Sequence, residues 1–189
     1  MTARLVRQGS YNPEPSHVTP TVMSNLRKYI RDVPDFPQPG ILFRDITPLL
    51  RNHFEQAVAE LGSLLPSVDW SRIDAVGGIE ARGFILAAAL ANQHGKGFVP
   101  IRKAGKLPPP VINASYALEY GKATLEMQSG SGRLVLVDDV FATGGTMDAA
   151  ATLATQAGFE VIDLLALIDL NLKPSFEWRG MRVQSVIRY

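Results

Sequence analysis

Short apolar runs alternate along this chain with segments in which apolar residues recur every three or four positions. Continuous apolar runs are typical of strands buried on both faces of a sheet, and the wider spacing is typical of helices with one buried face. The longest uninterrupted strand core is Leu134-Val135-Leu136-Val137, within a strand predicted at 134–139. Further strands are predicted at 73–77, 97–101, 161–169 and 183–187, and helices at 82–93 and 145–157. The alternation predicts an α/β fold with a mainly parallel central sheet flanked by helices.

Proline interrupts the first third of the chain. Residues 1–20 show no periodicity, so we predict a flexible N-terminal extension followed by a single domain at 21–189. A short helix to about residue 30 precedes an extended, ordered loop at 36–46, and an amphipathic helix is predicted at 53–65. Segments 115–120 and 123–128 predict a β-hairpin that turns at Gly121-Lys122.

Composition narrows the classes of protein. Apolar residues make up 46% of the chain, charged residues 20%, and the net charge is +1, so nothing indicates bulk binding of nucleic acid. The absence of cysteine excludes disulfides and thiolate chemistry and fits a reducing compartment. No segment reads as a signal peptide or reaches the roughly 20 apolar residues of a membrane span. We therefore expect a cytoplasmic protein without a membrane or nucleic-acid partner.

The segment 134–146 carries the clearest chemistry. Asp138 and Asp139 follow the apolar strand, and Ala-Thr-Gly-Gly-Thr then leads into a helix-prone stretch. A glycine-rich turn that enters a helix offers backbone N–H groups to a phosphate, at the end of a strand where α/β proteins bind ligands. The two acids suit ribose hydroxyls, a magnesium ion, or both. The segment thus predicts a ligand with a sugar and a phosphate; the alternative is an ordinary strand–turn–helix in which Asp139 caps the helix.

Two other predicted strands are followed by residues suited to anions. Gly77–Phe84 places a glycine turn and Arg82 between a strand and a helix, and three cations follow the strand at 97–101. The simpler alternatives are a surface arginine and a solvated basic loop. Because the carboxyl ends of parallel strands converge on one crevice, the two segments together favour a diphosphate.

The pattern Asp138-Asp139-x-x-Ala142-Thr143-Gly144-Gly145-Thr146 resembles the motif with which phosphoribosyltransferases bind phosphoribosyl pyrophosphate (PRPP), and specifically that of the adenine phosphoribosyltransferases. Together with four other segments between about residues 36 and 150, it follows the family order. The resemblance implies a type I phosphoribosyltransferase fold with a small hood at about 34–47, a core at about 53–189 and a mobile hairpin flap. It also implies a homodimer that converts adenine and PRPP to AMP and pyrophosphate with magnesium.

The same resemblance assigns individual residues. Those implied to hold the PRPP 5′-phosphate are Ala142, Thr143, Gly144, Gly145 and Thr146. Those implied at the pyrophosphate are Glu80, Ala81, Arg82, Arg102, Lys103 and Lys106, with a cis peptide bond between Glu80 and Ala81 and with Arg102 reaching the neighbouring subunit's site. Those implied at the adenine are Leu42, Phe43, Arg44 and Val140. The implied catalytic residues are Glu119, Asp138, Asp139 and Arg82, and magnesium would bind through PRPP near the two aspartates.

Two alternatives stay open at the level of sequence. The first is a phosphoribosyltransferase for another base, such as a 6-oxopurine, xanthine or orotate. Oxopurine enzymes tend to use a lysine from a late strand, whereas Lys173 falls in a predicted loop. The second is a PRPP-sensing regulator without catalysis; such proteins usually add a DNA-binding module, for which residues 1–20 are too short.

Overall fold

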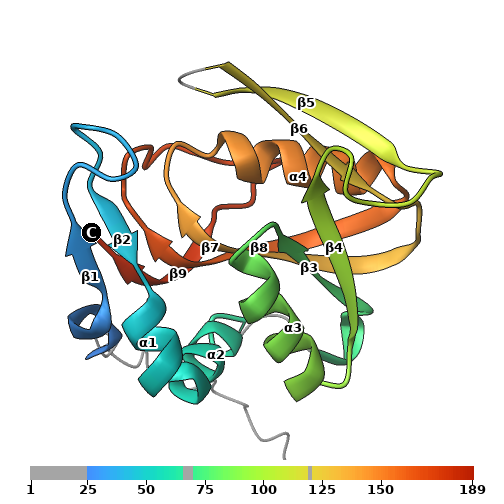
Figure 1. Cartoon of the computed structure of the whole chain (residues 1–189). Coiled ribbons are helices and arrows are strands. Elements are labelled where there is room, and N and C mark those ends of the chain that lie inside the picture. Colours follow the sequence, from blue (N-terminus) through green and yellow to red (C-terminus); the bar gives the residue numbers. More distant parts are fainter. Residues whose placement is uncertain (1–24, 66–69, 119–120) are drawn as a thin grey trace, which may run out of the picture.

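Seven strands form the central sheet, in the order β5-β6-β4-β3-β7-β8-β9 (Figure 1). The computed structural model describes residues 25–65, 70–118 and 121–189, so the predicted extension at 1–20 lies outside the described residues. The strands of this sheet are β3 (Ala75–Ile79), β4 (Gly97–Lys103), β5 (Ile112–Leu118), β6 (Gly121–Met127), β7 (Gly132–Phe141), β8 (Phe159–Asp169) and β9 (Gln184–Arg188). Strands β4, β3, β7, β8 and β9 run parallel, whereas β6 pairs antiparallel with both β4 and β5. The mainly parallel α/β fold is confirmed.

Strand β7 shows why a continuous apolar run forms the centre of this sheet. Leu134 and Leu136 pack in the core on the side of helix α4 (Gly145–Gln156), and Val135 and Val137 pack on the opposite side. Successive side chains of a strand point to opposite faces, so a strand that is covered on both faces needs apolar residues at every position. All four side chains are fully buried.

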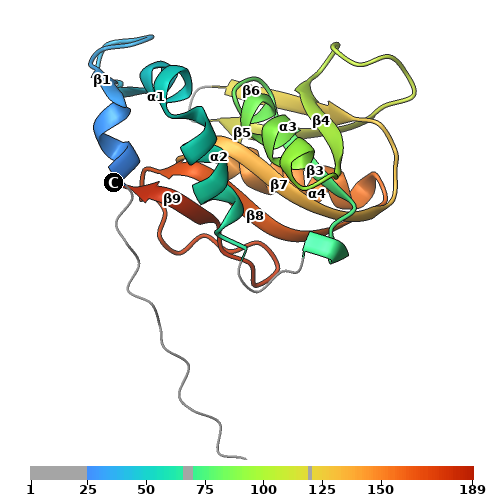
Figure 2. The same ribbon diagram turned by 90° about the horizontal axis from the view of Figure 1, so that it is seen from below.

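Helices cover both faces of the sheet. Helix α4 lies on one face, under the β5–β6 hairpin, while α2 (Phe54–Gly62) and α3 (Gly83–Gln93) lie on the other face (Figures 1 and 2). Short 3₁₀ turns occupy Asn25–Tyr29 and Trp70–Arg72. Among the described residues, none of the helices combines the length and apolar character that crossing a membrane requires.

The N-terminal part of the fold departs from prediction. Strand β1 (Arg31–Val33) pairs antiparallel with β2 (Phe43–Asp45), which lies inside the segment predicted as an extended loop, and forms a small second sheet near β9 and the C-terminus (Figure 1). Helix α1 (Thr47–Asn52) was not predicted. Its proline lies at the start of the helix, where the missing N–H has no intrahelical partner in any case.

The hairpin register also differs from prediction. Leu118 pairs with Gly121 and Ala117 with Lys122, so Gly121-Lys122 belongs to β6 and the prediction of a turn there is wrong. A glycine favours a turn locally, but the cross-strand register here places it in the ladder.

Candidate active site

The candidate site lies at the carboxyl ends of β3 and β7. After β3 the chain crosses by α3 to β4, and after β7 it crosses by α4, on the other face, to β8. Ligands of open α/β sheets bind in the crevice where the direction of winding reverses in this way. Arg82 follows β3, and the segment 142–146 follows β7, so the topology brings two of the predicted anion-binding segments to the same crevice.

Asp138 and Asp139 lie inside β7, because the strand extends to Phe141 rather than ending at residue 139. Asp138 Oδ1 accepts a hydrogen bond from the Asp139 backbone N–H at 2.8 Å. Gly83, the first residue of α3, packs directly on this part of the strand: an added Cβ would lie 2.9 Å from the Val137 carbonyl oxygen and 3.1 Å from Asp138 Oδ1. The glycine of the Arg82-Gly83 pair therefore allows α3 to begin against the acidic pair.

Burial sets the electrostatics of the two acids. Desolvation, followed by the neighbouring Asp139 carboxylate, raises the pKa of Asp138 well above its ordinary value. Burial also raises the pKa of Asp139, whose residue is 7% exposed, while the nearby Arg82 guanidinium acts in the opposite direction. Adjacent carboxylates in a low-dielectric crevice are costly, and such arrangements are typical of functional sites.

Arg82 joins the acidic pair to the small N-terminal sheet. Its Nη2 lies 2.6 Å from Asp139 Oδ2, and its Nη1 donates to the Arg44 carbonyl oxygen at 3.4 Å. The Arg82 guanidinium carbon also lies 4.9 Å from the centre of the Phe43 ring. Among the described residues, the buried Asp139 Oδ2 has no hydrogen-bond partner besides this ion pair, so Arg82 is the group that balances its charge.

The segment after β7 has the geometry expected of a phosphate cradle. Gly144 is the N-cap of α4 with φ 89°, and no side chain caps the helix, so its first N–H groups stay available. A cavity of about 60 Å³ is lined by Asp138, Val140, Phe141, Ala142, Thr143, Gly144, Gly145, Thr146 and Met147. Asp138 and the cradle therefore share one cavity. The alternative of a helix-capping Asp139 is wrong, because Asp139 lies in β7.

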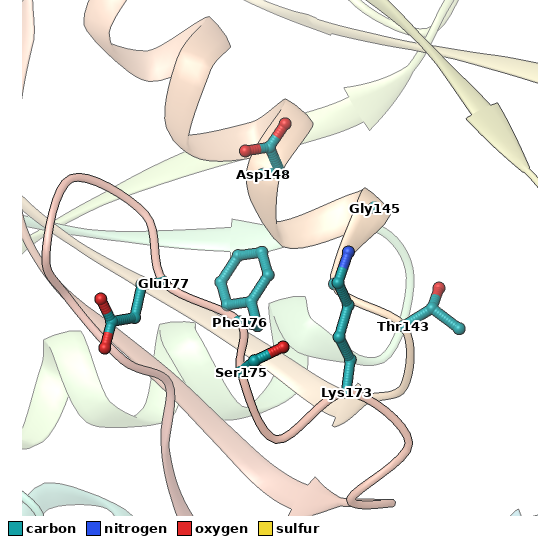
Figure 3. A pocket seen from close by; sticks show the side chains of 8 residues that line it. Thr143, Gly145, Asp148, Lys173, Ser175, Phe176 and Glu177 are labelled. Carbon is teal, nitrogen blue, oxygen red and sulfur yellow. The ribbon is translucent and has the colours of Figure 1, made fainter.

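A larger cavity of about 650 Å³ adjoins the cradle on the side of the loop after β8 (Figure 3). It is lined by Thr143, Gly144, Gly145, Asp148, Lys173, Ser175, Phe176 and Glu177. In Figure 3 the Lys173 side chain runs toward Gly145 at the start of α4. Lys173 is not among the residues predicted above to hold a phosphate. Its place after a parallel strand, at the same sheet edge as the cradle, is the signal that could have identified it.

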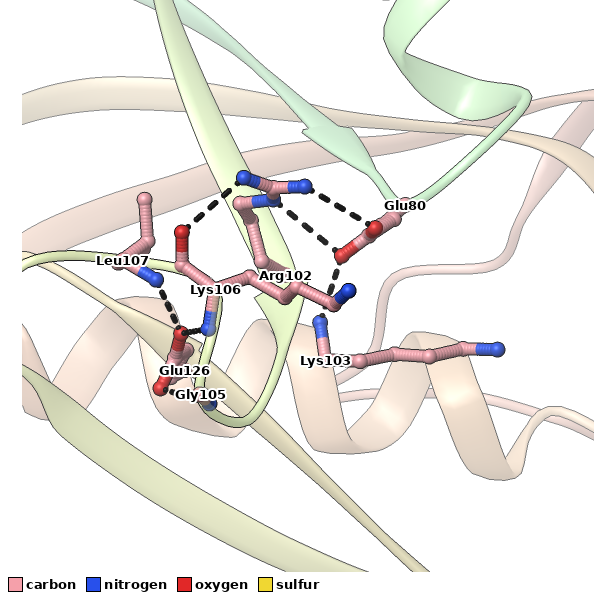
Figure 4. Close-up of polar contacts among 7 residues, drawn as sticks. All are labelled: Glu80, Arg102, Lys103, Gly105, Lys106, Leu107 and Glu126. Atoms are coloured by element: carbon pink, nitrogen blue, oxygen red, sulfur yellow. Dashed lines mark hydrogen bonds and ion pairs between the residues drawn. The ribbon is translucent and has the colours of Figure 1, made fainter.

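Arg102 and Glu80 form an ion pair at the ends of β4 and β3 (Figure 4). Arg102 Nη2 lies 3.1 Å from Glu80 Oε1, Nε lies 3.3 Å from Oε2, and the Lys103 backbone N–H donates to Oε2 at 2.9 Å. The hydrogen bonds from Arg102 are the main cause that lowers the pKa of Glu80. The Glu80 carboxylate therefore binds both Arg102 and the backbone of Lys103. The implied cis peptide bond between Glu80 and Ala81 is confirmed.

The residues predicted at a base lie on the small sheet and on β7. The Arg44 side chain forms an ion pair with Asp32, and its guanidinium carbon lies 3.8 Å from the centre of the Tyr189 ring. The Arg44 guanidinium therefore interacts with other residues of the fold. The Phe43 ring packs edge to face on the Phe36 ring, with 5.1 Å between the ring centres. Leu42 is exposed, and Val140 is half-buried. Glu119 lies outside the described residues.

Within the described residues, the acidic pair is the candidate donor set for a metal at this site. In the part of the chain that the structure describes, no three His, Cys, Asp or Glu side chains gather closely enough to hold a metal ion. Two adjacent carboxylates fit Mg²⁺ when a phosphate ligand supplies further oxygens, since this ion is usually bound by one or two carboxylates together with substrate phosphates.

Comparison with known proteins places the chain among close relatives. The family model for the phosphoribosyl transferase domain matches residues 48–179. The chain is 50% identical over 166 residues to an adenine phosphoribosyltransferase of Bdellovibrio bacteriovorus, covering 87% of this chain and 99% of the relative. The crystal structure of adenine phosphoribosyltransferase from Rhodothermus marinus matches with a TM-score of 0.77 at 41% identity, covering 87% and 96%. That from Saccharomyces cerevisiae, complexed with an imino-altritol bisphosphate and adenine, matches with a TM-score of 0.74 at 33% identity, covering 85% and 96%.

Proposed function

The chain belongs to the adenine phosphoribosyltransferases, a family of purine-salvage enzymes, and on this premise we propose that it converts adenine and PRPP to AMP and pyrophosphate with magnesium. The observation that carries the proposal is the single cavity shared by Asp138 and the cradle Ala142–Thr146. This cavity offers a phosphate site and a carboxylate to the same small ligand. PRPP has a phosphate on one side of its ribose and a diphosphate on the other.

The 5′-phosphate would bind at the cradle. The N–H groups at the start of α4 have no capping side chain, and the helix dipole adds positive charge at this end. The Thr143 and Thr146 hydroxyls add further donors. Lys173, which lines the adjoining cavity, would supply a full positive charge from the opposite wall.

The two carboxylates would hold the ribose. Asp138 lines the cradle cavity, and the buried Asp139 Oδ2 is paired with Arg82. Cleavage of the bond between ribose C1 and pyrophosphate builds positive charge on the sugar, which a nearby carboxylate stabilises. Magnesium would be held by PRPP near these acids and would neutralise charge on the diphosphate when bound.

The leaving pyrophosphate would be bound by the cations at the ends of β3 and β4. Arg82 follows β3, and Arg102, Lys103 and Lys106 lie at and just after the end of β4. In the structure Arg82 is paired with Asp139 and Arg102 with Glu80. These ion pairs orient the two guanidinium groups before a ligand arrives. A diphosphate would then replace each carboxylate or share its guanidinium.

Adenine would bind between the hood at about 34–47 and β7. The Phe43 ring lies beside Arg82, which in turn pairs with Asp139, so this ring is close to the proposed ribose site. Phe43 and Val140 would sandwich the purine, while the Leu42 carbonyl and the Arg44 N–H would read its edge. Because the Arg44 side chain is held by Asp32 and Tyr189, the backbone is the part of Arg44 left for this role.

The flap and the dimer complete the proposal. The β5–β6 hairpin would close over PRPP and keep water from the activated sugar, and Glu119 would handle the proton at purine N7. In a homodimer, the Arg102 that binds each pyrophosphate would come from the neighbouring subunit. A cytoplasmic location is consistent with a chain that contains no cysteine.

No observation favours the alternatives from the sequence. Lys173 lines the cavity beside the phosphate cradle rather than the residues proposed for the base, so it does not provide the lysine that a 6-oxopurine enzyme would use.

The proposal is tested by product balance. Purified protein is incubated with adenine, PRPP and magnesium, and AMP and pyrophosphate are quantified by chromatography and ³¹P NMR. We expect equal amounts of the two products, and none when adenine, PRPP or magnesium is omitted. Hydrolysis of PRPP without AMP, or binding of PRPP without turnover, would contradict the proposed reaction.

A further inference from the structure

Glu126 is a buried carboxylate that no step of the proposed reaction uses. It lies in β6 and is 3% exposed. Its Oε2 accepts the Gly105 backbone N–H at 2.9 Å, and its Oε1 accepts the N–H groups of Lys106 and Leu107, each at 2.6 Å (Figure 4). These backbone hydrogen bonds, that of Gly105 foremost, lower the pKa of Glu126, so the group binds the loop as a carboxylate.

Consecutive backbone N–H groups that point to one place form an anion-binding concavity. Here the concavity is made by the basic loop (residues 102–107), and the protein's own carboxylate fills it. The loop N–H groups are thereby unavailable to a phosphate. Since the charge of Glu126 has the same sign as that of a diphosphate, Glu126 is not suited to bind that ligand itself, and it would act on the ligand through the loop.

The hydrogen bonds continue from this loop to the turn after β3. The Lys106 carbonyl accepts a bond from Arg102 Nη1 at 3.1 Å, and Arg102 pairs with Glu80 through its other nitrogens. Glu80 leads directly into Ala81 and Arg82. A path of charged and polar contacts thus runs from the flap hairpin, through the basic loop, to Glu80, which is two residues before the arginine beside Asp139.

We propose that Glu126 is a positioning residue that fixes the basic loop, and through Lys106 holds Arg102 in place to bind pyrophosphate. The proposal rests on the proposed function, because it takes the basic loop to be a pyrophosphate site. Glu126 also ties that loop to hairpin β5–β6, so the flap and the basic loop are joined at this carboxylate. Loss of Glu126 would loosen Arg102 and Lys106 without touching the phosphate cradle.

The variant Glu126→Gln tests this directly. Glutamine keeps the size of the side chain but has one acceptor oxygen, and its amide donors would face loop N–H groups. We expect amide hydrogen exchange at Gly105, Lys106 and Leu107 to become about tenfold faster. We also expect PRPP binding, measured by calorimetry with magnesium, to weaken about tenfold, while AMP binding stays within about twofold because AMP has no pyrophosphate.

The matched control is Asp163→Asn. Asp163 is another buried carboxylate, on β8, where it accepts hydrogen bonds from Gln184 rather than from the basic loop. This variant should change neither loop exchange nor PRPP affinity. If Glu126→Gln does not fold, Glu126→Asp replaces it, because aspartate keeps the charge on a shorter side chain. Loop exchange and PRPP affinity should then change in the same directions but by smaller factors.

The outcomes separate this proposal from the function on which it rests. Unchanged loop exchange in Glu126→Gln, faster exchange with unchanged PRPP affinity, or equal weakening of AMP and PRPP binding would each overturn the positioning role. Wild-type protein that binds neither PRPP nor AMP would instead refute the proposed function, and the positioning role would fall with it.

Discussion

Replacing Gly144 with alanine would show how tightly the fold fixes the phosphate cradle. Gly144 has φ 89°, a left-handed conformation that costs a residue with a Cβ about 1–2 kcal/mol. The added Cβ would also lie 2.5 Å from Phe176 Cδ2, and such overpacking of a buried ring costs about 1–3 kcal/mol. The sum, about 2–5 kcal/mol, corresponds to a fall in Tm of roughly 4–20 °C for a chain of this size.

Gly180→Ala provides the matched control. Gly180 has φ 81°, but an added Cβ there would have no atom within 4 Å, so only the conformational cost of about 1–2 kcal/mol applies. The difference between the two variants, measured by thermal and chemical denaturation, isolates the contact with Phe176. Adding Phe176→Leu to Gly144→Ala should recover part of that difference.

The two glycine variants should also differ in their affinity for PRPP. Because Gly144 caps α4, its displacement should raise KM for PRPP about tenfold or more, whereas Gly180→Ala should leave KM unchanged. The account of the cradle would be refuted if Gly144→Ala were as stable as Gly180→Ala, or if it lost stability with an unchanged KM for PRPP.

Three further predictions concern the acids and the base site. Asp139→Asn should leave Tm within a few degrees and lower kcat by about 10²–10³, because charge beside the cationic sugar is lost; steady-state kinetics with an unchanged kcat would contradict this. Asp138→Asn should stabilise the protein by about 0.5–2 kcal/mol at pH 7, because burial raises the pKa of Asp138 in the folded protein. Protonated Asp138 destabilises the fold least, so the stability that its proton contributes to the wild-type protein is present at low pH and lost as pH rises through the folded pKa of Asp138. The extra stability of Asp138→Asn, measured by urea unfolding, should therefore shrink toward low pH. An extra stability that does not depend on pH would contradict this prediction. Phe43→Ala should raise KM for adenine about 3- to 10-fold without changing the preference over hypoxanthine, since a stacked ring does not read the purine edge.

The sequence predicts most of the site because its strongest patterns are local. The apolar run at Leu134–Val137 favours a strand in a sheet covered on both faces, and the Gly/Thr turn after it favours the ligand-binding edge. These two patterns predict where Asp138, Asp139 and the Gly/Thr turn lie without knowledge of the rest of the fold.

What the sequence did not predict depends on contacts between distant segments. The pairing of Arg31–Val33 with Phe43–Asp45 joins two short polar segments across a proline-rich loop, and neither is recognisable as a strand by itself. Glu126 occupies an ordinary polar position of a strand, and it is buried only because the loop after β4 lies against it. Lys173 lies in a loop, as predicted, but its place beside the start of α4 depends on how the two segments pack and cannot be read from the local sequence.

The measurement that tests the central claim most directly is a spectrophotometric assay of initial rates with PRPP and magnesium against adenine, hypoxanthine, guanine and xanthine. A hood that reads the purine edge with one backbone acceptor and one backbone donor leaves two polar pairs mismatched with hypoxanthine, at about 1–3 kcal/mol each. We expect kcat/KM for adenine to exceed that for hypoxanthine by roughly 10²–10⁴. Comparable rates with adenine and hypoxanthine would contradict backbone reading by the hood, and no turnover of adenine would contradict the proposed function itself.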